Sequence, residues 1–107
     1  MKLFTNAQLQ KLRTNYRKGG SHKPVVKLFN PCGAATWLLS ELDDDNIAFG
    51  LCDLGMGCPE LGYVSIAEIT SVRLPFGLKI ERDSHFKATK SLSEYAKEAR
   101  ESGQIAA

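Results

Sequence analysis

The sequence predicts one α+β domain, in which an antiparallel sheet of four to five strands packs with helices on one side or end. Three observations lead to this prediction. Short apolar stretches alternate with turn sequences, which is typical of strands joined by hairpins. Three capping-box sequences mark helices near the N-terminus, in the middle and near the C-terminus. A length of 107 residues suits a single domain.

Helices are predicted at 4–18, 65–72 and 91–102. Each has a Ser or Thr near its start that is followed three residues later by Gln or Glu. In such a capping box the two residues satisfy free backbone amides of the first helical turn. In the first helix the expected apolar stripe is Leu9, Leu12 and Tyr16, because these positions recur at helical spacing.

Strands are predicted at 25–30, 34–42, 47–54, 62–64 and 78–83. In the second strand, Ala35, Trp37 and Leu39 should share one face, and Leu38 and Leu42 the other. Apolar residues on both faces indicate a central strand that is partly covered on both sides.

The third and fifth strands carry further expectations about which side chains face inward. The small residues Ala48, Gly50 and Cys52 share one face of the third strand. They leave room for a close approach, which a helix makes more often than a ligand. In the fifth strand, Leu78 and Ile80 alternate with polar residues and should point inward.

The domain divides into three parts around a central platform. Residues 1–24 form a helix with a basic loop, 25–83 the sheet with its short helix, and 91–102 the C-terminal helix. Residues 34–66 form the platform, since they contain the central hairpin and the glycine-rich loop. We expect this platform to serve for contact and not for a reaction.

The composition predicts a cytoplasmic protein that does not enter a membrane. No window approaches the roughly 18 consecutive apolar residues of a membrane span. The N-terminus turns polar at Thr5 and lacks the apolar region of a signal peptide. The three cysteines, Cys32, Cys52 and Cys58, cannot all pair within the chain, so free thiols in a reducing compartment are expected.

Charge is distributed unevenly along the chain. Residues 1–40 contain seven Lys or Arg and no acidic residue, whereas residues 41–72 contain seven acidic residues and no Lys or Arg. The net charge is only +2. Either the two blocks neutralise each other in the fold, or the first block forms a basic surface for an anionic partner.

No motif for nucleotide, metal or nucleophile chemistry is complete. Pro59 interrupts the glycine-rich loop where a dinucleotide-binding turn would open a helix. The acidic run at 43–46 lacks the spacing of a calcium loop, and the cysteines lack the close pairs of a zinc site. We therefore expect no metal and no cofactor. A nucleophile made of Cys32 or Cys58 with His85 stays open, because only the fold can bring these residues together.

The densest polar cluster, residues 81–87, follows the last predicted strand. Together with the loop at 53–60 it is the best candidate binding surface, with the side chains Asp53, Glu60, Arg82, Asp83, His85 and Lys87. The alternative interpretation is a strand end held by salt bridges, with no binding role.

Three long sequence runs resemble one known family. They are LFNP-x-G-AATWLLSEL, FGLCDLG-x-G-x-PELGYVS-x-AE and GL-x-IERD-x-HFK-x-TK-x-LSEYA, and they span roughly residues 3 to 100. The family is a small bacterial one of unknown function, carried by conjugative plasmids and integrative mobile elements near antirestriction, partition and transfer genes. The resemblance implies an accessory role in a mobile element and supplies no catalytic residue.

Three functions follow as hypotheses. The first is a non-enzymatic accessory or regulatory protein that binds a host or plasmid protein, with counter-defence against a nuclease as one form. The second is a nucleic-acid-binding module whose phosphate contacts would be Arg13, Arg17, Lys18, Lys23 and Lys27. The third is an enzyme that acts on a small ligand through the 53–62 loop and the 81–87 cluster.

Overall fold

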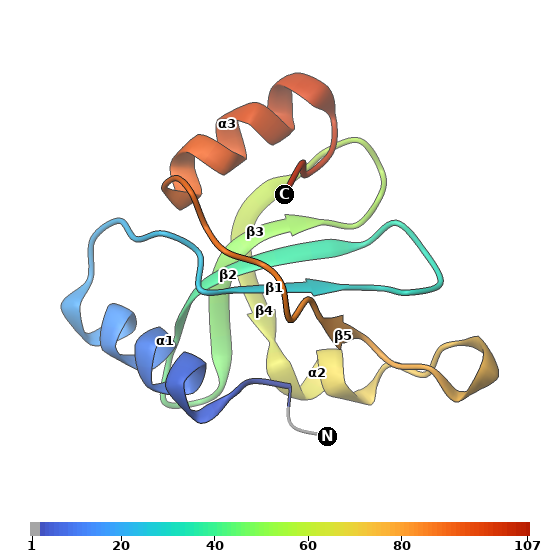
Figure 1. Cartoon of the computed structure of the whole chain (residues 1–107), viewed down its shortest axis with the longest axis horizontal. Coiled ribbons are helices and arrows are strands. Elements are labelled where there is room, and N and C mark those ends of the chain that lie inside the picture. The colour runs from blue at the N-terminus through green and yellow to red at the C-terminus, as the bar shows by residue number, and fades with distance from the viewer. Residues whose placement is uncertain (1–2) are drawn as a thin grey trace.

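The computed structural model describes residues 3–107, and five antiparallel strands form a single sheet at its centre (Figure 1). The strands are β1 (Val26–Phe29), β2 (Thr36–Leu42), β3 (Ile47–Asp53), β4 (Glu60–Ser65) and β5 (Glu81–Arg82). Their order across the sheet is β4-β3-β2-β1-β5. Four consecutive strands therefore form a meander, and β5 returns to pair with β1. This confirms the predicted α+β class and the antiparallel sheet.

The α-helices are α1 (Asn6–Lys18), α2 (Ile66–Ser71) and α3 (Leu92–Ser102). At α1 the Gln8 amide donates to Thr5 Oγ1 at 3.1 Å, and the Thr5 amide donates to Gln8 Oε1 at 2.9 Å. The same reciprocal pair joins Ser91 and Glu94 at α3, and Ser65 is the N-cap of α2. These predicted helix starts are confirmed. Within the described chain, no helix combines the length and apolar character needed to cross a bilayer.

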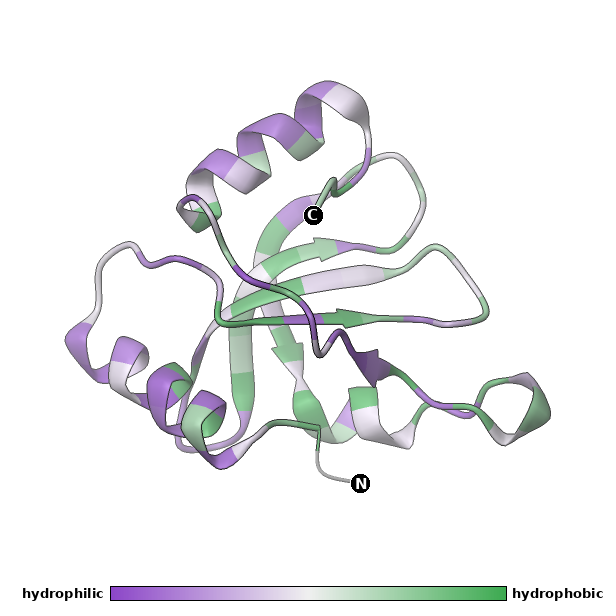
Figure 2. Cartoon of the chain, in the orientation of Figure 1, coloured by the Kyte–Doolittle hydropathy of each residue, from purple (hydrophilic) through white to green (hydrophobic). Residues whose placement is uncertain are grey.

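Helices cover both faces of the sheet. One core lies between the sheet and α1 and α2, and its buried side chains are Phe4, Leu12, Val26, Leu28, Trp37, Leu39, Leu42, Ala48, Ile69 and Ile80. The other lies between the sheet and α3, and its buried side chains are Leu38, Leu51, Leu92, Tyr95, Ala96 and Ala99. Figure 2 shows the polar residues of α1 and α3 on their outward sides. The helices do not gather on one side or end as expected, because the central strands are apolar on both faces and both need a cover.

The buried side of α1 differs from the predicted stripe. Leu12 is fully buried and Leu9 is half-buried, but Tyr16 is 46% exposed. Asn15 faces the sheet instead, and its Nδ2 donates to the carbonyl of Ser40 at 3.0 Å. A buried amide requires such a partner, so this bond fixes the rotation of α1 against β2.

A β-bulge at Ser40 shifts the register between β2 and β3 by one residue. The extra residue reverses the alternation of faces beyond it. Leu42 therefore lies in the same core as Trp37 and Leu39, and not on the face of Leu38 as predicted. Strict alternation along the sequence cannot show where such a bulge occurs.

Gly50 lies opposite the bulge, where the two strand backbones come very close. A Cβ at Gly50 would lie 2.0 Å from the carbonyl oxygen of Leu38. The other small residues of this face, Ala48 and Cys52, pack into the core beneath α1 and α2. The small residues of this face therefore serve two purposes. Ala48 and Cys52 make room for the helix-covered core, and Gly50 makes room for the backbone of the neighbouring strand.

The two edges of the sheet differ from the prediction in length. The predicted strand 78–83 is reduced to β5, and the chain before it forms a tight turn at Pro75–Gly77. Ile80 is buried as predicted, but Leu78 is 38% exposed. At the opposite edge, β4 is longer than the predicted 62–64, so it is the more extensive open edge.

Replacement of Gly50 by alanine should destabilise the fold, because its Cβ and the Leu38 carbonyl would overlap. We expect the free energy of unfolding to fall by about 3 kcal/mol, the upper range for overpacked sites. Gly62→Ala is the matched control, since Gly62 pairs with Gly50 and a Cβ there meets no atom within 4 Å. Its effect should stay within about 0.5 kcal/mol. Urea unfolding followed by tryptophan fluorescence measures both, and equal losses would contradict this account of Gly50.

Candidate functional site

Two adjoining hollows lie where the C-terminal residues 104–107 fold back from α3 toward the sheet (Figure 1). One, of about 440 Å³, is lined by the ends of β1, β2 and β3 and by residues 104–105. The other, of about 350 Å³, is lined by residues of the 83–90 segment, by Tyr95 and by residues 106–107. Asp83 lines both. We call them the tail hollows.

Asp53 anchors the C-terminal residues beside the first of these hollows. It ends β3, and only 3% of its surface is exposed. Its Oδ1 accepts the Gly55 amide at 2.8 Å, and its Oδ2 accepts the Ile105 amide at 3.0 Å. A buried carboxylate needs such donors, and here they hold the β3–β4 loop and the C-terminal residues together.

Lys27 and Asp83 join β1 to the chain after β5. Lys27 Nζ lies 3.6 Å from Asp83 Oδ2 and donates to the backbone oxygen of Ala107 at 2.6 Å. Asp83 Oδ1 accepts the His85 amide at 2.9 Å, which forms a tight turn. These charged groups therefore bond to the chain itself and fix the shape of the tail hollows.

The structure brings four of the six predicted binding residues to the tail hollows. Asp53 and Asp83 line the first, and Asp83, His85 and Lys87 line the second. Glu60 is exposed on β4, which is separated from β1 by β3 and β2. The Arg82 guanidinium donates to the Leu3 carbonyl at 2.9 Å, on the side of the sheet covered by α1 and α2.

The tail hollows do not bring Cys32 or Cys58 together with His85, the pairs left open as nucleophile and base. Cys32 lies in the β1–β2 turn and Cys58 in the β3–β4 loop, and neither lines the hollow that contains His85. His85 is exposed, and its Nδ1 lies 3.3 Å from Ser84 Oγ. In the part of the chain that the structure describes, no three His, Cys, Asp or Glu side chains are grouped to hold a metal ion.

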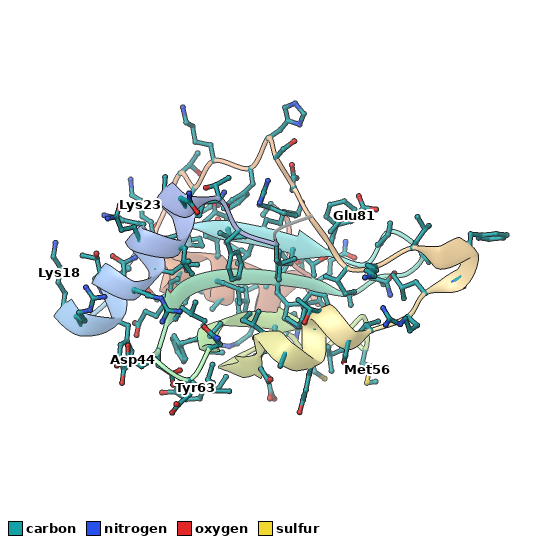
Figure 3. The ribbon with its side chains drawn as sticks, turned by 90° about the horizontal axis from the view of Figure 1, so that it is seen from below. Lys18, Lys23, Asp44, Met56, Tyr63 and Glu81 are labelled. Atoms are coloured by element: carbon teal, nitrogen blue, oxygen red, sulfur yellow. The ribbon has the colours of Figure 1, made fainter. Side chains whose placement is uncertain are left out.

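Two of the five basic residues of the nucleic-acid hypothesis are held by bonds within the chain. Arg13 donates to the Asp43 carbonyl at 2.8 Å and to Asn46 Oδ1 at 2.9 Å, which ties α1 to the β2–β3 turn. Lys27 is held in the tail hollows. Arg17, Lys18 and Lys23 are exposed at the end of α1 and in the loop after it. Figure 3 shows Lys18 and Lys23 at the surface.

The open edge of the sheet, strand β4, carries exposed apolar side chains. Tyr63 is 76% exposed, and Leu61 is also exposed on the same face. The ring centroids of Tyr63 and of Phe49 on β3 are 5.1 Å apart, so Tyr63 rests on an aromatic neighbour. Figure 3 shows where Tyr63 lies at the rim of the sheet. Leu54 and Met56, in the loop before β4, are exposed as well. We call these four exposed residues, with the backbone of β4, the β4 edge.

The backbone of β4 is also open to a partner. The Ile66 amide donates to the Asn46 carbonyl at 3.1 Å, and bonded pairs alternate along an antiparallel ladder. The amides and carbonyls of Leu61 and Tyr63 therefore point away from β3. Natural edge strands are usually blunted by charges, proline or bulges. Glu60 is the one charged residue in β4, so this edge has little such protection.

The β4 edge is not among the binding surfaces predicted from the sequence. The available signal was the alternation of Leu61 and Tyr63 with Gly62. That pattern predicts a strand with one apolar face, but it does not show which strand lies at the edge. Edge position depends on the order of all five strands, which no local pattern contains.

Substitution of Asp53 should release the C-terminal residues. In Asp53→Ala the amides of Gly55 and Ile105 lose a charged acceptor, a local loss of about 2 kcal/mol. We expect roughly thirtyfold faster hydrogen exchange at the Ile105 amide. Asp53→Asn keeps one oxygen acceptor and should be intermediate, and the exposed Glu60→Ala should change nothing. Unchanged exchange in Asp53→Ala would show that other contacts hold this segment.

The three cysteines should differ in reactivity. Burial raises the pKa of the Cys52 thiol, because the thiolate is poorly solvated there. Cys32 and Cys58 are exposed. At about pH 8 a chromogenic disulfide reagent should modify two thiols quickly and one slowly, since the thiolate is the reacting form. The slow phase should disappear in Cys52→Ser and become fast in denaturant. Three equal rates would contradict this assignment.

Comparisons with known proteins give one family and no further relative. The chain has no match among the curated proteins and none among the solved structures. A family model described as "Protein of unknown function (DUF2958)" matches residues 3–106. The match includes every helix and strand described above. The chain therefore belongs to the DUF2958 family.

Proposed function

We propose that this chain is a non-enzymatic accessory or regulatory protein of bacterial mobile elements that acts in the cytoplasm by binding another protein. The assignment to mobile elements rests on the sequence motifs. The binding role rests on the β4 edge, where an open strand combines unpaired backbone groups with the exposed side chains of Leu61 and Tyr63.

The expected mode of binding is addition of an extended segment of the partner as a sixth strand. The outward amides and carbonyls of Leu61 and Tyr63 supply ladder hydrogen bonds, which recognise a strand independently of its sequence. Selectivity would come from the side chains. Tyr63, supported by Phe49, and Leu61 offer an aromatic and an aliphatic contact on one face of the added strand.

The arrangement of the tail hollows supports binding over catalysis. Three of their charged groups, Asp53, Lys27 and Asp83, hydrogen-bond to backbone groups of the chain or pair with each other. A catalytic pair instead requires a nucleophile within hydrogen-bond reach of its base. His85, which lines the second hollow, has Ser84 Oγ 3.3 Å from its Nδ1, but both of these residues are exposed to solvent and do not lie in a closed site.

Nucleic-acid binding remains the second candidate, and one observation favours it. Arg17, Lys18 and Lys23 are exposed, and none of them forms an ion pair with a described residue. The site would be small, since Arg13 and Lys27 are engaged elsewhere. A basic surface of three charges predicts weak binding to duplex DNA. The logarithm of the association constant should fall with the logarithm of the salt concentration, at a slope near −3.

The β4 edge can be tested by photo-cross-linking inside cells that carry the parent element. We expect a benzophenone amino acid at position 63 to cross-link a protein, while the same group at the exposed Lys97 on α3 should not. Leu61→Pro removes an outward amide but leaves the β3–β4 ladder in place. It should weaken binding of the purified partner by at least tenfold, or about 1.4 kcal/mol.

Two controls keep this test specific. Tyr63→Ala removes the aromatic contact and should weaken binding without changing the backbone edge. Thermal unfolding of both variants should stay within a few degrees of the unmodified chain, since both sites are exposed. Cross-links to nucleic acid, or equal cross-links at positions 63 and 97, would argue against the proposed function.

A further inference from the structure

The hairpin between α2 and β5 projects from the body of the protein (Figure 1). Its arms are joined by a hydrogen bond from the Leu74 amide to the Leu78 carbonyl at 3.0 Å. At the tip, the Leu78 amide donates to the Pro75 carbonyl at 3.2 Å. We call residues 73–79 the tip hairpin. These bonds and the fixed φ of proline give the turn a defined shape.

The backbone of this turn is unfavourable for one of its residues. Phe76 has φ 62° and ψ 24°, and Gly77 has φ 71°. Two central residues with positive φ are typical of a type I′ turn, where Asn, Asp and Gly are preferred. Gly77 suits its position, whereas a bulky aromatic residue with positive φ is a steric outlier.

The side chain of Phe76 does not offset this strain by packing, because 98% of it is exposed. A single exposed apolar residue is ordinary in a folded protein. Here, however, backbone strain and full exposure of a large apolar ring occur in the same residue. Neither feature helps the fold, and strain of this kind is concentrated at functional positions.

The surroundings of the ring describe the surface that it would meet. Arg73 and Lys79 flank the turn, are exposed, and form no ion pair with a described residue. A hollow of about 470 Å³ at the base of the hairpin is lined partly by Leu3, Leu78 and Ile80. The contact surface is therefore an aromatic projection beside two cations, with a base that is partly apolar and also includes Thr70 and Glu81.

We propose that the tip hairpin anchors this chain to a partner protein by inserting the Phe76 ring into a preformed apolar pocket. Acidic residues at the rim of that pocket would face Arg73 and Lys79, since complementary charges give such contacts their specificity. This contact lies outside the β4 edge and does not depend on it. A buried aromatic anchor surrounded by polar contacts is the usual centre of binding energy at a protein interface.

A protein partner fits the hairpin better than a lipid surface does. A turn held in one strained shape benefits only a partner of defined shape, because a ligand presented in its bound conformation loses less entropy on binding. A lipid bilayer is fluid and accepts an apolar side chain in any orientation, so it would gain nothing from a turn of fixed shape. One aromatic ring and two cations also provide little stable membrane attachment.

The decisive variant is Phe76→Gly, because glycine accepts positive φ. This variant should keep or raise the thermal stability, because the strained residue is gone. It should lose binding, because the aromatic ring is gone. A benzophenone amino acid at position 76 should cross-link a protein in cells carrying the parent element, and the same group at Lys97 should not. With that purified protein, Phe76→Gly should weaken binding at least thirtyfold, and Phe76→Leu, which keeps an apolar side chain, should weaken it less.

Two further tests examine the charges beside Phe76 and binding to lipid. Arg73→Glu with Lys79→Glu should slow association at low salt more than at high salt. The cross-linked residue of the partner should lie in an apolar pocket bordered by Asp or Glu. The proposal is overturned if position 76 captures nothing, captures only a second copy of this chain, or if the full chain binds phosphatidylglycerol vesicles in a Phe76-dependent way. Capture at position 63 without capture at 76 would reject the tip hairpin alone.

Discussion

The close contact between β2 and β3 at Gly50 determines how the rest of the fold is arranged. The Leu38 carbonyl occupies the space where a side chain at Gly50 would begin. That approach accommodates the bulge at Ser40, and the bulge returns Leu42 to the core beneath α1. It also places the Ser40 carbonyl where Asn15 of α1 can bond to it. The absence of a side chain at Gly50 thus allows the shifted register, which in turn places Leu42 in the core and the Ser40 carbonyl within reach of α1.

Because β2 and β3 are apolar on both faces, the sheet needs a cover on each side. α1 and α2 supply one, and α3 with residues 104–107 supplies the other. Asp53 accepts from the Ile105 amide and Lys27 donates to the Ala107 backbone oxygen, so these two residues hold the end of the second cover, while Asp83 pairs with Lys27. Charged residues that would suggest a reactive site in the sequence are therefore used to position chain segments. Of the residues predicted to form a binding surface at 53–60 and 81–87, four line the tail hollows, and the hydrogen bonds that Asp53 and Asp83 accept there come from backbone amides of the chain itself.

The surfaces left uncovered lie outside the tail hollows. The β4 edge is exposed because the meander ends there and, in the described sheet, no strand pairs with the outer side of β4. The tip hairpin is exposed because the chain must connect α2 to the opposite edge of the sheet, where β5 pairs with β1. Both surfaces present aromatic residues to solvent, which is a composition characteristic of protein contacts. The topology of the sheet, more than any single motif, creates these two surfaces.

The sequence by itself determined the features that depend on near neighbours. The capping boxes at Thr5 and Ser91 act over three residues, and the apolar alternation of the strands acts over two, so both could be predicted. Only the tertiary structure decided the bulge at Ser40, the covering of both faces, the separation of Glu60 and Arg82 from the tail hollows, and the identity of the open edge. Each of these depends on pairing between distant segments, where a shift of one residue moves a side chain to the opposite face.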